Sequence, residues 1–257
     1  MSACMITDLN IDQLMSECSS NSQSRIELWM NFIRRAQIRK MVEVGVYKGD
    51  FAAAVLKKCA CVDTYYMVDP WRHLDDWNKP ANQDNSVFEG FFEEVKAKTS
   101  FAGGRRVILR GKTTEVVDQI SDCELDFAYI DGDHTLKGIT IDLVRLYPKV
   151  RAGGFIGGDD FSQTIWMHKT SFEPTLVFPF AVYFAEAVGA TIYALPHIQF
   201  CLQKTEKPRF RFVDFTHQYD QLSLRDQLAP EKLLKLAFGE RFPRAAQVMR
   251  AAAGRLR

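Results

Sequence analysis

Glu124-Leu-Asp-Phe-Ala-Tyr-Ile-Asp131-Gly-Asp133-His134 decides the fold, together with Gly153-Gly-Phe-Ile-Gly-Gly-Asp159-Asp160 further along the chain. Each stretch is a short apolar strand that ends in carboxylates, and the residues between the two have helical spacing. Two strands joined through a helix pair in parallel, so both acidic ends lie at the same edge of one sheet. Clustered carboxylates repel one another unless a cation or a proton lies among them. The sequence therefore predicts an acidic site at this edge.

Length and composition favour a small-molecule enzyme. The chain has 257 residues, of which 47% are apolar, enough for one α/β domain with appendages. Thirty-three basic and thirty-two acidic residues nearly cancel, which argues against nucleic-acid binding. The six cysteines form no C-x-x-C pair, and no apolar run is long enough to span a membrane. We expect a cytoplasmic protein that binds a small molecule, with no membrane or nucleic-acid partner; a homodimer is possible.

The chain falls into three predicted parts. Residues 1–38 contain apolar positions at helical spacing and form a helical segment that either caps the core or covers a pocket. Residues 39–204 alternate strands and helices and end in a hairpin around Pro196, which must be antiparallel. Residues 205–257 form a basic helical extension, interpreted as a solvated surface, with core docking, a dimer contact or anion binding left open. The predicted fold class is a doubly wound α/β sheet.

A glycine turn follows the first predicted strand. Glu43, Gly45 and Gly49 give the pattern E-x-G-x-x-x-G, and glycine is needed where a backbone turns sharply or approaches a ligand. The pattern lacks the third glycine of the dinucleotide fingerprint. It is also compatible with an ordinary turn between a strand and a helix. Asp69 ends the second strand, where doubly wound folds bind ribose hydroxyls, although it is also suited to start a turn with Pro70.

Gly111-Lys112-Thr113-Thr114-Glu115 opens a helix after the third strand. The free N–H groups of a helix start and a hydroxyl could hold the edge of an adenine, or could simply cap the helix. Both interpretations stay open from the residues alone.

Together, the D-G-D-H and G-G-x-x-x-x-D-D patterns resemble class I S-adenosylmethionine-dependent methyltransferases over about residues 38–204. The resemblance is strongest to the metal-dependent small-molecule O-methyltransferases, of the catechol type and of the type that methylates sugar hydroxyls. It implies a Rossmann-like seven-stranded sheet whose last strand is antiparallel. It also implies that the cofactor S-adenosylmethionine is bound by Glu43, Gly45, Tyr47, Gly49, Asp69, Lys112, Thr113 and Asp131.

The same resemblance implies a divalent ion, normally Mg²⁺, held by Asp131, Asp159 and Asp160. Mg²⁺ prefers hard oxygen ligands and lowers the pKa of a coordinated hydroxyl. A general base must then reach that hydroxyl, and the resemblance gives Asp133 or His134 this role. The residues alone are equally compatible with a turn aspartate and a structural histidine.

The pattern departs from the catechol type at Asp160, where that type has asparagine, and this favours the sugar-modifying type. The aromatic residues on the predicted ligand edge suit a phenolic or a sugar ring. We therefore predict a Mg²⁺-assisted O-methyltransferase of a sugar or phenolic natural product. The alternatives are a metal-independent O- or N-methyltransferase and a non-catalytic partner protein with this fold.

Overall fold

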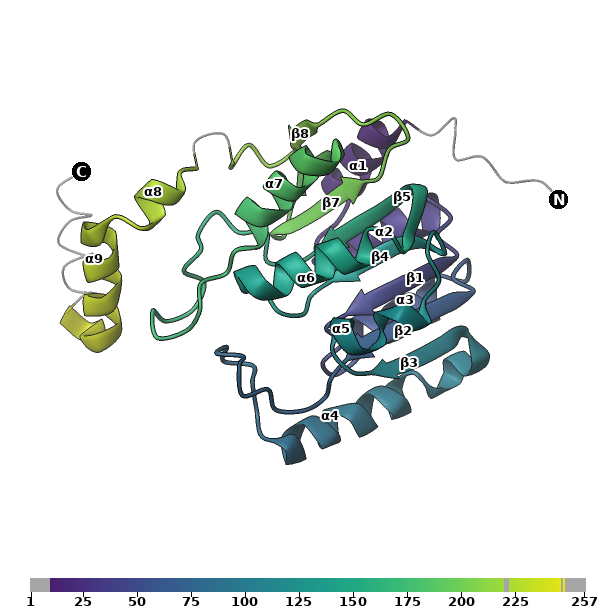
Figure 1. Ribbon diagram of the computed structural model, residues 1–257, viewed down its shortest axis with the longest axis horizontal. Helices are drawn as coiled ribbons and strands as arrows, with labels where there is room; N and C mark the ends of the chain where they lie inside the picture. Colours follow the sequence, from purple (N-terminus) through teal and green to yellow (C-terminus); the bar gives the residue numbers. More distant parts are fainter. Residues whose placement is uncertain (1–9, 220–221, 246, 248–257) are drawn as a thin grey trace.

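The computed structural model describes residues 10–219, 222–245 and 247 (Figure 1). Helices and strands alternate through most of the chain, as predicted. The strands are β1 (Lys40–Val44), β2 (Thr64–Asp69), β3 (Arg106–Arg110), β4 (Leu125–Ile130), β5 (Val150–Gly158), β6 (Thr191–Leu195), β7 (Gln199–Gln203) and β8 (Arg211–Asp214). The α-helices are α1 (Ile11–Ser20), α2 (Arg25–Arg35), α3 (Asp50–Lys58), α4 (Asn85–Lys98), α5 (Thr113–Val116), α6 (Leu136–Leu146), α7 (Val177–Val188), α8 (Leu224–Gln227) and α9 (Pro230–Arg241).

Within the described ranges the strands form one sheet in the order β3-β2-β1-β4-β5-β7-β6-β8. Strands β1 to β5 pair in parallel, and β7 is antiparallel to both β5 and β6. The doubly wound fold and the terminal hairpin are therefore confirmed. The predicted count of seven strands is one too low, because Arg211–Asp214 adds β8 in parallel to β6. The sheet thus continues past the predicted boundary at residue 204.

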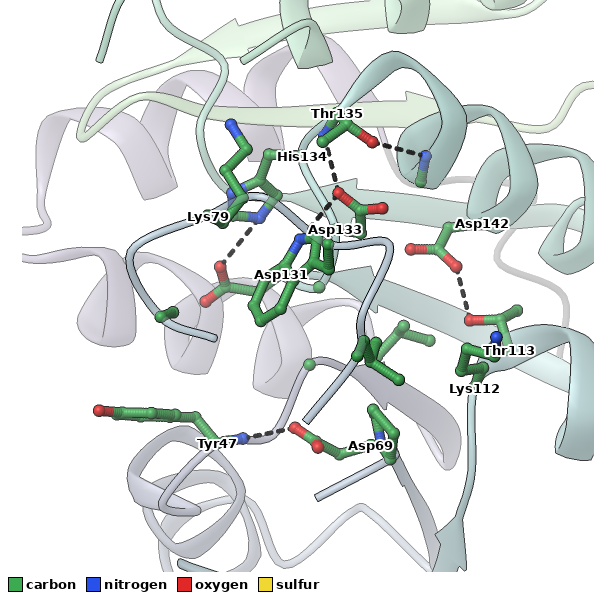
Figure 2. Close-up of a pocket in the computed structure, with 18 of the residues that line it drawn as sticks. Tyr47, Asp69, Lys79, Lys112, Thr113, Asp131, Asp133, His134, Thr135 and Asp142 are labelled. Carbon is green, nitrogen blue, oxygen red and sulfur yellow. Dashed lines mark hydrogen bonds and ion pairs between the residues drawn. The ribbon is translucent and has the colours of Figure 1, made fainter. Parts of the chain in front are cut away.

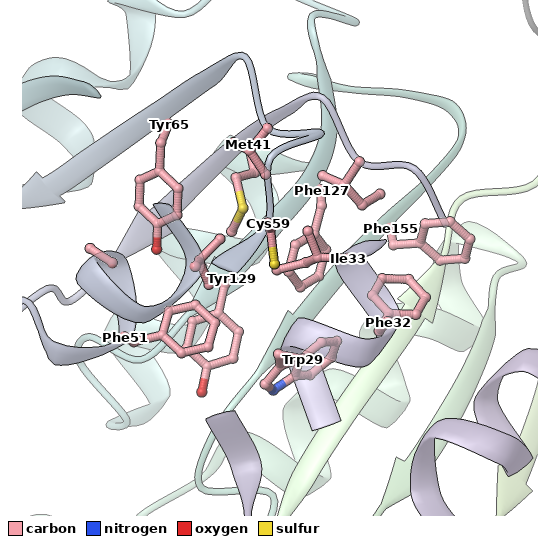
Figure 3. Close-up of a cluster of buried hydrophobic side chains, with 14 of the residues drawn as sticks. Trp29, Phe32, Ile33, Met41, Phe51, Cys59, Tyr65, Phe127, Tyr129 and Phe155 are labelled. Carbon is pink, nitrogen blue, oxygen red and sulfur yellow. The ribbon is translucent and has the colours of Figure 1, made fainter. Parts of the chain in front are cut away.

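Side chains alternate between two apolar cores, one on each face of the sheet. Met41 of β1 belongs to the core beneath α1, α2, α3 and α4, whereas its neighbour Val42 belongs to the core beneath α5, α6 and α7. This two-sided burial is the expected consequence of the alternation of side chains along a strand with both faces covered. Figure 3 shows the first core, in which Trp29, Phe127 and Tyr129 pack together.

Helix α2 lies in this first core and confirms the helix predicted from apolar spacing in the N-terminal segment. Trp29, Phe32 and Ile33 are fully buried. A Cβ on Gly157 of β5 would lie 2.3 Å from the Trp29 ring, so a glycine is required for this close approach. The indole Nε1 of Trp29 also donates a hydrogen bond to the side chain of Gln199 on β7, at 2.8 Å. Helix α2 is therefore fixed to the sheet at several points.

The first part of the C-terminal extension docks on the core, where Tyr219 is buried and Phe212 and Phe215 pack, whereas its last described helix is solvated. Helix α9 has no buried residue, and Leu234 and Phe238 are exposed. This arrangement agrees with a solvated helical surface; residues 220–221, 246 and 248–257 of the predicted extension lie outside the described residues. In the part of the chain that the structure describes, no helix is long and apolar enough to cross a membrane.

Candidate active site

A cavity of about 1300 Å³ opens at the carboxyl ends of β1, β2 and β4. Open α/β sheets bind their ligands at this edge, where the order of the strands reverses. Here the reversal falls between β1 and β4, which are neighbours although β2 and β3 separate them in the sequence. Single small-molecule pockets usually measure about 300–1,000 Å³. The cavity therefore has room for two ligands side by side.

The glycine turn after β1 forms the floor of the cavity. Gly45 has a φ of +86°, and a Cβ there would lie 2.1 Å from the carbonyl oxygen of Asp131. Its N–H donates to the carbonyl of Val68 at 2.9 Å, and the N–H of Asp131 donates to the carbonyl of Val44 at 2.7 Å. The ends of β1 and β4 thus meet backbone to backbone, which leaves the space above them open to a ligand. Gly49, with a φ of +75°, precedes α3 and does not itself line the cavity, although its neighbours Lys48 and Asp50 do.

Asp69 holds this turn in place (Figure 2). Its Oδ2 accepts the N–H groups of Val46 and Tyr47 at 3.0 and 2.9 Å, and its Oδ1 accepts that of Trp71 at 2.7 Å. Burial raises the pKa of Asp69 to about 6 in spite of these three donors. Oδ1 keeps one acceptor position, and the residue lines the cavity. Asp69 therefore braces the turn, and its predicted contact with a ribose stays a prediction.

Glu43 is a buried carboxyl group beside the cavity. Tyr65 donates its hydroxyl proton to Glu43 Oε2 at 2.7 Å, and burial raises the pKa of Glu43 well above its usual value. Tyr47, by contrast, is exposed and packs its ring against Phe91 at the cavity rim. Both predicted residues line the cavity.

The start of α5 lines another part of the cavity. Lys112 precedes the helix, and its N–H donates to Glu115 at 2.9 Å, which is the capping role left open by the sequence. Thr113 is buried and donates its hydroxyl proton to Asp142 Oδ1 of α6 at 2.5 Å (Figure 2). Burial raises the pKa of Asp142 to about 7. Asp142 was not predicted, because its sequence position is that of an ordinary helix residue.

The three acids predicted to hold a metal ion are paired with other side chains of the protein. Asp131, Asp159 and Asp160 do come together, but Arg25 of α2 lies between the first two, donating from Nη1 to Asp131 Oδ2 at 2.7 Å and to Asp159 Oδ2. Gln199 donates to the other oxygen of Asp159 at 2.5 Å. Among the described residues, no group of three or more histidines, cysteines and acids is arranged to hold a metal ion. The magnesium site therefore stays a prediction, and in this structure Arg25 and His134 are paired with its three proposed ligands.

His134 neutralises the third carboxylate. Its Nδ1 contacts Asp160 Oδ2, and its Nε2 lies 3.4 Å from Asp131 Oδ1, an ionic contact too long for a good hydrogen bond. Burial lowers the pKa of His134, but the two carboxylates outweigh burial and raise it to about 10. A raised pKa favours the protonated ring, and a protonated ring has no lone pair with which to accept a further proton. The role of His134 as a general base stays a prediction.

Asp133 stands at the entrance to α6 and lines the cavity. Its Oδ1 accepts the N–H of Thr135 at 3.0 Å, the turn geometry that the sequence left open, and the indole Nε1 of Trp77 at 3.1 Å (Figure 2). No described residue donates to its Oδ2. Asp133 thus combines a structural role with one oxygen that is available to a ligand.

Two loops above Asp133 close one side of the cavity. Lys79 is buried and donates from Nζ to the carbonyl of Glu173 at 2.8 Å and to the hydroxyl of Thr175 at 3.1 Å. Asn78 donates to the carbonyl of Ser171 at 3.0 Å. Lys79 could not be predicted because its loop has no periodicity; the nearby aromatic residues Trp71 and Trp77 were the available signal.

The strand order and this cavity define a class: the chain has the fold of the class I methyltransferases. The model of a methyltransferase domain family matches residues 42–161, from β1 to just beyond β5. The predicted resemblance to class I S-adenosylmethionine-dependent methyltransferases is therefore confirmed. No curated protein matches the sequence.

Solved structures agree on the fold. An O-methyltransferase from Bacillus cereus in complex with SAH has a TM-score of 0.51 and 11% identity, over 79% of this chain and 94% of its own. The O-methyltransferase TomG from Streptomyces achromogenes, in complex with SAM, has a TM-score of 0.51 and 13% identity, over 76% and 91%. A Staphylococcus aureus protein assigned as a caffeoyl-CoA O-methyltransferase reaches a TM-score of 0.54 and 14% identity, over 77% and 93%.

Proposed function

We propose that this protein is an enzyme that transfers a methyl group from S-adenosylmethionine to a hydroxyl group of a small molecule, either a sugar or a phenol. The observation that supports this most strongly is the layout of the cavity. One part has the glycine turn, Asp69 and the Thr113–Asp142 pair, and another part has the available oxygen of Asp133. The volume admits a cofactor and an acceptor together.

The residues present fit the cofactor. The bare backbone at Gly45 leaves a cradle that a Cβ would fill, and Asp69 keeps one acceptor position for a hydroxyl. The Asp142 carboxyl, which among the described residues accepts only from Thr113, can accept from an exocyclic amine. When bound, S-adenosylmethionine would supply an electrophilic methyl group on its sulfonium sulfur.

The protein groups then orient the acceptor and remove its proton. Asp133 Oδ2 can accept the proton of a hydroxyl, and the hydrogen bonds from Trp77 and Thr135 to Oδ1 hold the carboxylate in one orientation. The two loops joined through Lys79 limit access of water from that side. Mg²⁺ assistance, predicted from the sequence, is not part of the proposal because its three ligands are paired with Arg25 and His134.

Two substitutions test this proposal. Asp69→Ala removes the brace of the glycine turn and should weaken S-adenosylhomocysteine binding, measured by calorimetry. Asp133→Asn keeps the Oδ1 acceptor and should leave that binding unchanged, while methylation of a panel of phenols and sugars falls by about 10²–10⁴-fold. A protein that does not bind S-adenosylhomocysteine at all would refute the proposal and favour a non-catalytic partner. The panel should also contain amines, because methylation of an amine in place of a hydroxyl would instead identify an N-methyltransferase.

A further inference from the structure

Three carboxylates converge beside the cavity, yet four of their six oxygen atoms already face a donor. Arg25 donates to one oxygen each of Asp131 and Asp159, and His134 Nδ1 contacts one oxygen of Asp160. The remaining oxygen of Asp159 accepts from Gln199 at 2.5 Å and from the N–H of Asp160 at 2.8 Å. Among the described residues, Asp131 Oδ1, which lies 3.4 Å from His134 Nε2 without a hydrogen bond, and Asp160 Oδ1 are left without a donor. A hard divalent ion needs several ionised oxygens with free lone pairs, and this arrangement does not offer them.

Arg25 is held in this place by a rigid element. It is the first residue of α2, and Trp29, one turn later, is fully buried against the sheet. Gln199 ties the two features together, because it accepts from the Trp29 indole at 2.8 Å and donates to Asp159. The same contacts that dock α2 therefore also bring the Arg25 guanidinium to the carboxylates.

The position of Arg25 is not explained by its own helix. The N-terminus of a helix carries a partial positive charge, so a cation in the first turn is unfavourable there. The attraction must come from outside the helix, and the only acidic side chains that Arg25 contacts in the described ranges are Asp131 and Asp159. Its guanidinium bridges them, as a metal ion would.

We infer that Arg25 is a built-in cation that takes the place of a divalent metal ion between Asp131 and Asp159, so that this site functions without metal. Arg25 is then a positioning residue: it holds the Asp131 carboxylate beside the backbone of the glycine turn. One consequence of this inference, that turnover is insensitive to EDTA, rests on the proposed function. The metal-binding claim can be measured without any substrate.

The experiment uses Mn²⁺, which has the oxygen-ligand preference of Mg²⁺ and is detected by electron paramagnetic resonance. Wild-type protein should leave Mn²⁺ free in solution. Arg25→Met, which keeps the length of the side chain and removes its charge, should bind one Mn²⁺ at least about tenfold more tightly than wild type. Asp159→Asn added to Arg25→Met should abolish that binding. Arg34→Met is the matched control, because Arg34 lies on the same helix and its hydrogen bonds stay within it.

The melting temperature is a second readout, which stays informative if Arg25→Met is less stable than wild type. Mg²⁺ should raise the melting temperature of Arg25→Met and leave those of wild type and Arg34→Met unchanged, because only a species that binds the ion is stabilised by it. Tight Mn²⁺ binding by wild type would overturn the inference, and so would an absence of binding and of thermal stabilisation in Arg25→Met. A gain by Arg34→Met would also overturn it, since net charge would then be the cause. Calorimetry with S-adenosylhomocysteine on the same samples shows separately whether the proposed function fails.

Discussion

Asp142 should make the stability of this protein depend on pH. The residue is 4% exposed, and among the described residues its carboxyl accepts a hydrogen bond only from Thr113. Burial raises its pKa from the usual 3.8 to about 7, because a charge is poorly solvated there. The folded protein therefore holds this proton more tightly than the unfolded chain does.

The sign and size of this pH effect on stability follow from the linkage between proton binding and folding. A group whose pKa is higher in the folded state contributes stability that is complete below its unfolded pKa and is lost as the pH rises to the folded value. That window runs from about pH 4 to 7 here. Each pH unit inside it is worth about 1.4 kcal/mol, so the free energy of unfolding should fall by about 3 kcal/mol between pH 5 and pH 8 on account of Asp142 alone.

Urea unfolding of wild type and of Asp142→Asn at pH 5, 6, 7 and 8 isolates this effect. Asparagine does not titrate, and the other ionisable groups are shared, so their contributions cancel in the difference between the two proteins. The difference should shift by about 3 kcal/mol in favour of the variant as the pH rises. Two stability curves that stay parallel across this range would refute the reasoning. If Asp142 also binds the cofactor, the variant should bind S-adenosylhomocysteine more weakly than wild type at pH 8.

Three further substitutions test the packing around the site. Gly45→Ala should abolish S-adenosylhomocysteine binding in calorimetry and cost about 3 kcal/mol, because φ is positive and the new Cβ meets the Asp131 carbonyl; normal binding would contradict the role of the turn. Gly157→Ala should push Trp29 off the sheet and lower the melting temperature by several degrees, about 2–4 °C per kcal/mol, and an unchanged melting curve would show that α2 adapts. Gln199→Leu leaves the buried indole N–H of Trp29 without an acceptor and removes a donor from Asp159, and should cost about 2–4 kcal/mol in urea unfolding. A cost below about 1 kcal/mol would show that Gln199 does not link α2 to Asp159.

The sequence by itself determined the doubly wound sheet and the edge where the site lies. Apolar strands alternate with helices, and the turn at Gly45 and the acids at Asp69 and Asp131 each follow a strand. These features are local, and parallel strands place their carboxyl ends at one edge whatever the rest of the chain does. The convergence of Asp131, Asp159 and Asp160 followed from the same rule.

Only the tertiary structure decided what faces those acids. Arg25 lies 106 residues before Asp131, and their contact exists because Trp29 and Gly157 let α2 dock closely on the sheet. The pairing of His134 with Asp160 and the partnership of Asp142 with Thr113 have the same origin. Periodicity shows that a helix has an apolar face but not the position at which it docks, and that position determines which charges meet. The sequence could therefore predict an acidic edge, whereas the identity of the cation that neutralises it depended on long-range packing.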